Sequence, residues 1–207
     1  YNPATFPFQM RDRVNVKLDK PPRIICMGNI GKSQNLEAVV EAFQADEALA
    51  EKGAKLVITG TGVAEANVRK AIVTDRVELL GLVSDERLRH ELEIADLGIV
   101  TQSYEGGEFN VPSKLMNYLA MGLPVVASVD LDGEISRIIN SSGGGWVTDH
   151  RDLREFTKTL GQVFDDRGQL DQRSKAGFEF AQENLSPWAL AQKFDKILQA
   201  SQETREK

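Results

Sequence analysis

The chain has 207 residues and 41% of them are hydrophobic, which is enough to bury a sizeable core in one large domain or two small ones. The formal net charge of −6 argues against a nucleic-acid-binding protein, and no apolar run approaches the roughly 18 residues of a membrane span. The N-terminus lacks both an initiator methionine and the apolar segment of a signal peptide, and the single cysteine, Cys26, has no partner for an intrachain disulfide. We therefore expect a piece of a longer protein from a reducing, cytoplasmic compartment, with no nucleic-acid partner.

The predicted elements begin after a proline-containing segment, residues 1–22, which is expected to form a linker or an extended arm. From residue 23 onwards, short apolar runs alternate with segments of helical periodicity. The apolar runs, each bounded by glycine, proline or a charged residue, are predicted strands: 23–27, 55–60, 76–81, 96–101, 123–128 and 144–148. The segments between them are predicted helices: 35–50, 64–73, 85–95, 113–121 and 132–140. The last part of the chain is charged and without strands, and its predicted helices are 152–165, 168–183 and 187–203.

This alternation predicts an α/β fold, in which a Rossmann-like, doubly wound parallel sheet is followed by C-terminal helices. In such a sheet the ligand binds at the carboxyl ends of the strands. The loops that follow the predicted strands are therefore the candidate site: 28–35, 60–63, 81–85, 101–113 and 128–133.

The first of these loops contains Gly31-Lys32-Ser33, which looks like the end of a phosphate-binding P-loop. A P-loop needs a further glycine at the position of Cys26, and Cys26 lies inside the first apolar run, so the loop is too short to surround a triphosphate. A strand, a glycine-containing turn with one cation and a helix can nevertheless bind a phosphate, because a helix N-terminus presents free N–H groups. A P-loop ATPase remains an alternative, and it predicts Mg²⁺-dependent ATP binding at Lys32.

The loop from Thr101 to Lys114 is long, polar and contains glycine, and it joins a predicted buried strand to a predicted helix. Long loops in compact domains are often functional. Ser113 is predicted to cap the helix, and the free amides together with Lys114 would form an anion site. An ordinary surface loop with an ordinary helix cap is the alternative.

The segment EFNVPSKLMNYLAMGLPVVAS, residues 108–128, resembles the donor-site segment of GT-B glycosyltransferases of family GT4, the glycosyl transferases group 1. Residues 120–127 match the end of that family's motif residue for residue. Further landmarks follow in the family's order: its phosphate loop at 28–35, its Gly-x-Gly turn at 56–62, its base-contacting loop at 81–86, and later motifs at 133–135 and 185–188. The resemblance covers about residues 23–203, and the Pro-Ser-Lys-Leu segment resembles the branch of capsule, O-antigen and exopolysaccharide transferases.

The resemblance implies a retaining glycosyltransferase that transfers a sugar from a nucleotide-diphosphate donor, with UDP-sugar expected, to a polysaccharide or lipid-linked acceptor. It implies no metal and no cofactor. Residues 1–22 would be the arm from a missing N-terminal domain, 23–184 the donor-binding domain and 185–207 a C-terminal helix, so that the chain alone would be inactive. The protein would work in the cytoplasm, peripherally at the inner face of a bacterial membrane.

The resemblance also assigns site residues. Glu108 would be the catalytic-site acid that contacts the sugar. The donor-binding residues would be Gly28, Asn29, Gly31, Lys32, Gln34, Gly62, Leu82, Val83, Asn110, Val111, Pro112, Ser113, Lys114 and Asn117. Lys32, Lys114 and the helix start at Ser113 would stabilise the diphosphate. Val83 would present its backbone to the base.

Two departures from the family's pattern stand out. The family's second glutamate, which binds the ribose, falls at Asn117, and its arginine falls near Asn29, which leaves Lys32 and Gln34 as phosphate candidates. The family's first glutamate falls at Phe109, and a shift by one residue would bring Glu108 to that place. An epimerase of nucleotide sugars with the GT-B fold and a non-catalytic nucleotide-binding module remain alternatives. His90 and His150 are expected to be surface or structural residues, and no cluster has the spacing of a metal site.

Overall fold

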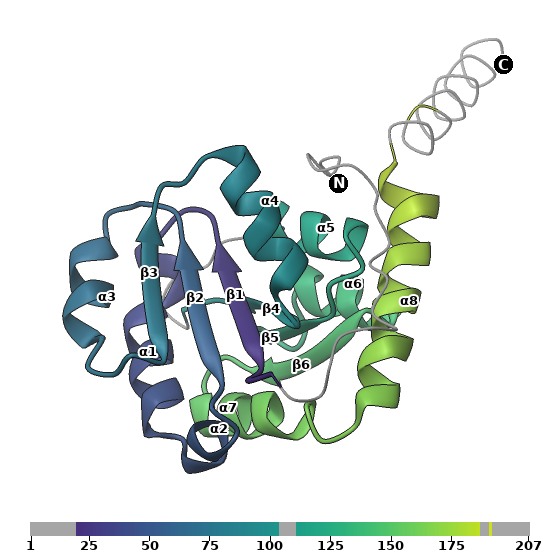
Figure 1. The fold of residues 1–207 in the computed structure, drawn as a ribbon. Helices are drawn as coiled ribbons and strands as arrows, with labels where there is room; N and C mark the ends of the chain where they lie inside the picture. The colour runs from purple at the N-terminus through teal and green to yellow at the C-terminus, as the bar shows by residue number, and fades with distance from the viewer. Residues whose placement is uncertain (1–19, 104–110, 187–190, 192–207) are drawn as a thin grey trace, which may run out of the picture.

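A computed structural model describes residues 20–103, 111–186 and 191, and its order of elements is shown in Figure 1. Within these residues the strands form one sheet in the order β3-β2-β1-β4-β5-β6, with every pair parallel. The strands are β1 Arg23–Met27, β2 Lys55–Thr59, β3 Val77–Gly81, β4 Leu97–Thr101, β5 Val125–Val129 and β6 Gly145–Asp149. The predicted doubly wound parallel sheet is confirmed, because the strand order reverses direction between β1 and β4.

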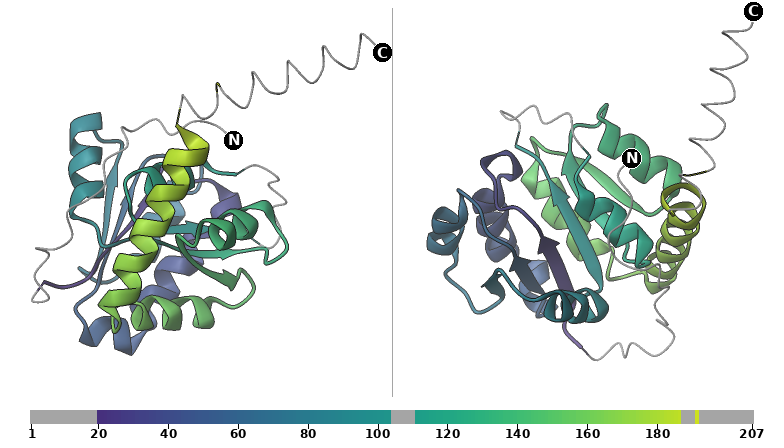
Figure 2. Two further views of the ribbon diagram at one scale, coloured as in Figure 1. Left: turned by 90° about the vertical axis from the view of Figure 1, so that its right-hand side faces the viewer. Right: turned by 90° about the horizontal axis from the view of Figure 1, so that it is seen from above.

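Helices cover both faces of this sheet (Figure 2). They are α1 Leu36–Ala45, α2 Glu47–Glu51, α3 Glu65–Ala71, α4 Asp85–Ile94, α5 Ser113–Ala120, α6 Glu134–Ser142, α7 Leu153–Gln162 and α8 Arg167–Leu185, with a short 3₁₀ turn η2 at Lys32–Gln34. One core cluster joins one face of the sheet to α1, α2, α3 and α7. A second cluster joins the opposite face to α4, α5, α6 and α8. The central strands β4 and β5 are buried at every position, as expected for strands covered on both faces.

The single helix predicted for 35–50 is wrong, because the structure divides it into α1 and α2. Asp46 takes an extended conformation between them, and its side chain accepts a hydrogen bond from the Leu49 amide. Aspartate is a favoured N-cap, so it starts a second helix inside what reads as one periodic segment. Asn35, at the start of the predicted helix, has a left-handed φ of 51° and precedes α1 instead of belonging to it.

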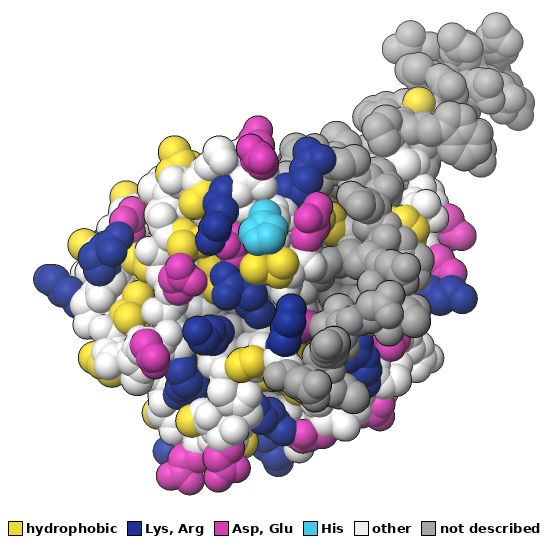
Figure 3. All heavy atoms as spheres, viewed as in Figure 1, with side chains coloured by type: hydrophobic (Ala, Val, Ile, Leu, Met, Phe, Trp, Pro, Cys, Tyr) yellow, Lys and Arg dark blue, Asp and Glu magenta, His cyan; other side chains and the backbone are white. Residues whose placement is uncertain are grey.

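The other predicted elements agree with the structure to within a few residues, and α8 continues to Leu185 instead of ending at 183. The arm before residue 20 and the predicted helix at 187–203 lie outside the described residues, apart from residue 191. Of the helices that the structure describes, none is both long enough and apolar enough to cross a membrane. On the face drawn in Figure 3, Lys and Arg side chains are interspersed with acidic and apolar ones.

Candidate functional site

The loops that follow β1, β2 and β3 are tied together by their backbones. The Gly28 amide donates to the Thr59 carbonyl at 2.9 Å, and the Gly60 amide donates to the Gly81 carbonyl at 2.8 Å. A Cβ at Gly60 would lie 1.8 Å from the Gly28 carbonyl oxygen, and the φ of Gly60 is +127°. Only glycine permits this approach, so the three loops form one continuous rim at the carboxyl edge of the sheet.

The predicted Gly-x-Gly residue Gly62 belongs to the same rim. A Cβ at Gly62 would lie 2.4 Å from the Ile30 carbonyl oxygen, and the Ile30 amide donates to the Thr61 carbonyl at 2.9 Å. Gly62 therefore allows the β2 loop to pack against the β1 loop. This packing alone explains the glycine at residue 62, without a bound ligand.

The β1 loop itself leaves β1 at Gly28, which has a φ of +104°, and runs to the turn η2. Cys26 lies inside β1, so the position where a P-loop requires glycine is part of a strand. Asn29 and Lys32 are exposed, whereas Gly31 is buried at the start of η2. Among the predicted phosphate residues of this loop, Lys32 thus carries the exposed cation.

The end of β4 is joined to the β1 loop. The Thr101 hydroxyl donates to the Gln34 carbonyl at 2.7 Å, and the Ser103 amide donates to the Ser33 carbonyl at 2.5 Å. These bonds lie between β1 and β4, where the strand order reverses. A crevice at this point of an open α/β sheet is the expected ligand position.

Helix α5 points its N-terminus towards this junction, but it does not start as the sequence predicts. Its N-cap is Pro112, with φ −70° and ψ 136°, and no side chain caps it. Ser113 is the first helical residue and is exposed, so the prediction that the Ser113 hydroxyl caps the helix is wrong. With Pro112 as the N-cap, the helix begins one residue earlier than a Ser113 cap would allow, so that hydroxyl lies in the first turn.

Lys114, the second residue of α5, is buried with only 5% of its surface exposed. Its ammonium donates to the Gln34 Oε1 at 2.6 Å and contacts the Cys26 Sγ at 3.7 Å. Neither partner is a carboxylate, and no carboxylate of the described residues lies within ion-pair distance of Lys114. A buried charge without an opposite charge is costly, so this ammonium marks a place where an anion is expected.

The contact with Lys114 changes the interpretation of Gln34. Its Nε2 donates to the Asn29 carbonyl, while its Oε1 accepts from Lys114. Gln34 was predicted as a direct phosphate ligand. In the structure, the two ends of its carboxamide form hydrogen bonds with the β1 loop and with Lys114. Asn117, one turn after Lys114, is buried, with only 4% of its surface exposed.

Tyr118 holds α5 against β1, and sequence reasoning did not identify it. Its hydroxyl accepts from the Met27 amide at 3.0 Å and donates to the Ile25 carbonyl at 3.3 Å. Burial, with the nearby Cys26 as a smaller cause, raises the pKa of the Tyr118 phenol well above its usual 10.0. Gly98 of β4 makes room for the ring, because a Cβ there would lie 2.7 Å from the Tyr118 Cδ2.

The remaining predicted site residues lie around this rim or outside the described part of the chain. Leu82, after β3, is 82% exposed, and Val83, Val111 and Pro112 are partly buried. Glu108 and Asn110 lie outside the described residues, so their predicted roles stay predictions.

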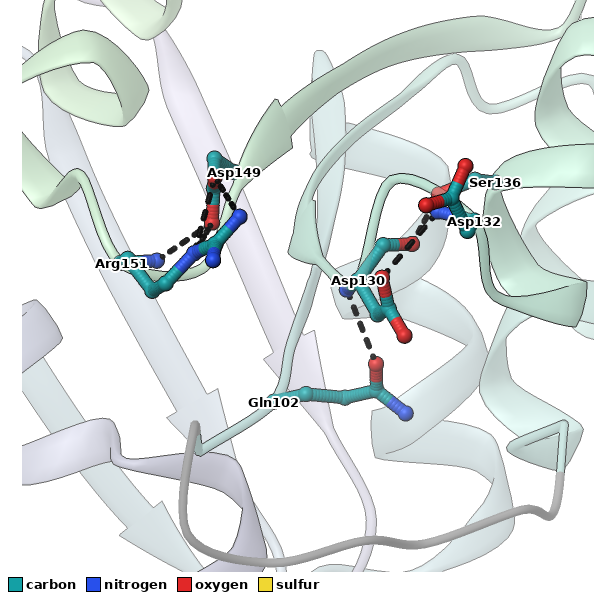
Figure 4. Close-up of polar contacts among 6 residues, drawn as sticks. All are labelled: Gln102, Asp130, Asp132, Ser136, Asp149 and Arg151. Atoms are coloured by element: carbon teal, nitrogen blue, oxygen red, sulfur yellow. Dashed lines mark hydrogen bonds and ion pairs between the residues drawn. The ribbon is translucent and has the colours of Figure 1, made fainter.

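Polar residues also gather where β4, β5 and β6 end, and Figure 4 shows local turns together with one contact between the loops of Gln102 and Asp130. The Gln102 Oε1 accepts from the Asp130 amide at 3.5 Å, and the Asp130 carboxylate accepts from the Asp132 amide at 3.1 Å. Asp149 is held by Arg151, whose guanidinium lies 2.6 Å from a carboxylate oxygen, and these hydrogen bonds lower the pKa of Asp149 to about 2.

Metal ligands do not gather at these turns. Across the described residues there is no group of three or more His, Cys, Asp and Glu side chains that could hold a metal ion. His90 is exposed on α4, and His150 is partly buried in the turn after β6, as expected for surface or structural residues.

Comparison with known proteins shows that the chain is similar to glycosyltransferases. The sequence model of a family described as "Glycosyl transferases group 1" matches residues 21–166. The chain is 28% identical over 199 residues to the probable glycosyltransferase WbjE of Pseudomonas aeruginosa, covering 91% of this chain and 48% of that protein. It is 27% identical over 166 residues to the amylovoran biosynthesis glycosyltransferase AmsK of Erwinia amylovora, covering 76% of this chain and 39% of AmsK.

Solved structures show the same fold. The structure of Anabaena Alr3699/HepE in complex with UDP superimposes with a TM-score of 0.69 at 13% identity, covering 88% of this chain and 50% of that one. The chain thus spans half the length or less of each of these three proteins.

Proposed function

The chain belongs to the glycosyl transferases group 1 family, and we propose that it forms the donor-binding half of a retaining glycosyltransferase. The donor is a nucleotide-diphosphate sugar, with UDP as the nucleotide, and the acceptor is a polysaccharide or a lipid-linked sugar. Because the chain spans only about half of its relatives, transfer needs a second half that supplies the acceptor site. The chain alone therefore binds the donor nucleotide without transferring the sugar.

The observation that carries this proposal is the buried ammonium of Lys114 at the switch point of the sheet. When a sugar leaves a nucleotide diphosphate, negative charge builds up on the diphosphate. A fixed ammonium in a water-poor site stabilises that charge more strongly than an exposed one. The N-terminus of α5, which Ser113 begins, adds free amides and a positive dipole at the same place.

The other parts of the donor, namely its base, ribose, outer phosphate and sugar, would contact residues along the rim and its neighbouring loops. The loop after β3 would place the backbone of Val83 against the base, and Asn117 would hold the ribose. The UDP complex of the structurally similar HepE supports uridine as the base. Lys32 would contact the outer phosphate from the exposed side of the β1 loop, and Glu108 and Asn110 would contact the sugar.

The names of the relatives support a polysaccharide acceptor. AmsK is named for amylovoran biosynthesis, and WbjE is named a probable glycosyltransferase. We assign the whole protein to the assembly of a bacterial surface polysaccharide, acting at the cytoplasmic face of the membrane. No metal or cofactor is invoked, since Lys114 and the start of α5 supply positive charge to the leaving group.

Calorimetric titration of the chain with UDP, GDP, ADP and ATP, each with and without Mg²⁺, tests the proposal. We expect UDP to bind in preference to the other nucleotides and to bind without Mg²⁺, with UMP as the control that lacks the second phosphate. Failure of every nucleoside diphosphate to bind would refute the proposal. Mg²⁺-dependent binding of ATP would favour a P-loop ATPase instead. Preferential UDP binding together with interconversion of the sugar by the longer protein, without transfer, would favour the epimerase.

A further inference from the structure

We propose that Gln34 is a positioning residue that holds the Lys114 ammonium with a neutral oxygen and so keeps its full positive charge available to the donor's diphosphate. The inference rests on the proposed function and deepens it, since it states how the positive charge of the phosphate site is kept available. It predicts that a carboxylate at residue 34 would neutralise the lysine and block the anion.

The geometry fixes the orientation of the Gln34 carboxamide. Its Nε2 donates to the Asn29 carbonyl, and a carbonyl can accept only from the amide nitrogen of the glutamine. The Oε1 must therefore face the other way, where it accepts from Lys114 at 2.6 Å. The Gln34 backbone is held as well, because its carbonyl accepts from the Thr101 hydroxyl at 2.7 Å. Gln34 thus connects the β1 loop, the end of β4 and α5.

No carboxylate of the described residues pairs with the ammonium. Besides Gln34, the ammonium contacts the Cys26 Sγ, and the residue one turn later on the same helix is the buried amide Asn117. Among the described residues, Lys114 is the one Lys or Arg side chain that is buried. The free protein bears the cost of an uncompensated charge, and a bound diphosphate would relieve it.

If Gln34 positions Lys114, a change at residue 34 should alter UDP affinity without lowering the stability of the protein. If Gln34 had only a structural role, both quantities would fall together. In Gln34→Glu, a carboxylate of the same shape would stand at hydrogen-bond distance from the ammonium. The buried charge would then be paired in the free protein, which offsets the loss of the Nε2 donor to the Asn29 carbonyl, so the melting temperature should change little. Affinity for UDP should fall about 10- to 100-fold, because the diphosphate must compete with an internal carboxylate for the same ammonium.

The test measures UDP affinity and the unliganded melting temperature of four proteins: the wild type, Gln34→Glu, Lys114→Gln and the exchange Gln34→Lys with Lys114→Gln. The exchange returns an ammonium to the other end of the same hydrogen bond, so it should recover most of the affinity that Lys114→Gln loses. Gln162→Glu, an exposed residue of α7, makes the same chemical change away from the site and should leave both quantities unchanged.

The outcomes separate the two proposals. A wild-type chain that binds no nucleoside diphosphate refutes the proposed function. A wild type that binds UDP, with Gln34→Glu binding equally well, refutes this inference alone. A Gln34→Glu variant that loses affinity and melting temperature together also refutes it, because that result indicates a structural role for Gln34.

Discussion

Replacing Tyr118 by phenylalanine should loosen the contact that fixes α5 on β1. The substitution keeps the ring, which fills the space above Gly98, so it leaves no cavity. It removes the acceptor of the Met27 amide, which is 3.0 Å from the hydroxyl in a buried position, and a second, longer bond to the Ile25 carbonyl. An unpaired buried amide costs about 1–3 kcal/mol, so we expect a loss of roughly 2 kcal/mol of unfolding free energy.

Urea unfolding followed by tryptophan fluorescence measures this loss directly. For a domain of this size, ~2 kcal/mol corresponds to a fall of roughly 4 to 8 °C in the melting temperature. Ser141→Ala is the matched control, since it also removes one hydroxyl, but from an exposed residue that bonds within its own helix to the Ile138 carbonyl. A Tyr118→Phe variant as stable as Ser141→Ala would show that water replaces the hydroxyl at Met27 and that Tyr118 does not anchor α5.

Three further substitutions test other parts of the structure. Gly60→Ala should cost more than about 3 kcal/mol, because its Cβ would lie 1.8 Å from the Gly28 carbonyl oxygen, and a urea midpoint near that of the wild type would contradict the close approach. Glu91→Gln should lower the free energy of unfolding in urea by about 2 kcal/mol, because the fully buried Glu91 pairs with Arg23 at 2.5 Å. A variant as stable as the wild type would mean that the desolvation of the two charges cancels the gain from the ion pair. Asp149 has a pKa lowered from 3.8 to about 2, so it adds stability above pH 3.8 that is lost as the pH falls towards 2. Asp149→Asn should therefore flatten the dependence of the melting temperature on pH in that range, and a slope equal to that of the wild type would contradict the assignment.

The sheet could be predicted from the sequence because each strand is a short apolar run and each connection carries a helical pattern. The same alternation directed attention to the loops after the strands, whereas the position of the switch point between β1 and β4 came only from the structure. The division of 35–50 at Asp46 was missed because the segment contains no glycine or proline, although an aspartate followed by a glutamate is itself a helix-start signal.

The chemistry of the site was less predictable, because it depends on contacts between distant residues. Lys114 could be named as a phosphate candidate, but its bond to Gln34 joins residues 80 positions apart in the sequence. The anchoring role of Tyr118 likewise depends on Met27 and Gly98, which belong to different strands. No local pattern contains such a contact, so Gln34 was expected to touch phosphate directly.

The burial of α5 has a consequence for how this protein can change. Its residues from Lys114 to Ala120 are all buried, so that most substitutions in this helix will alter folding and ligand affinity together. The neighbouring loops differ, since Val63 and Leu82 are about four-fifths exposed at 81% and 82%. In a library of random variants, altered nucleotide preference should therefore arise mainly from those loops, while α5 tolerates few replacements of any kind.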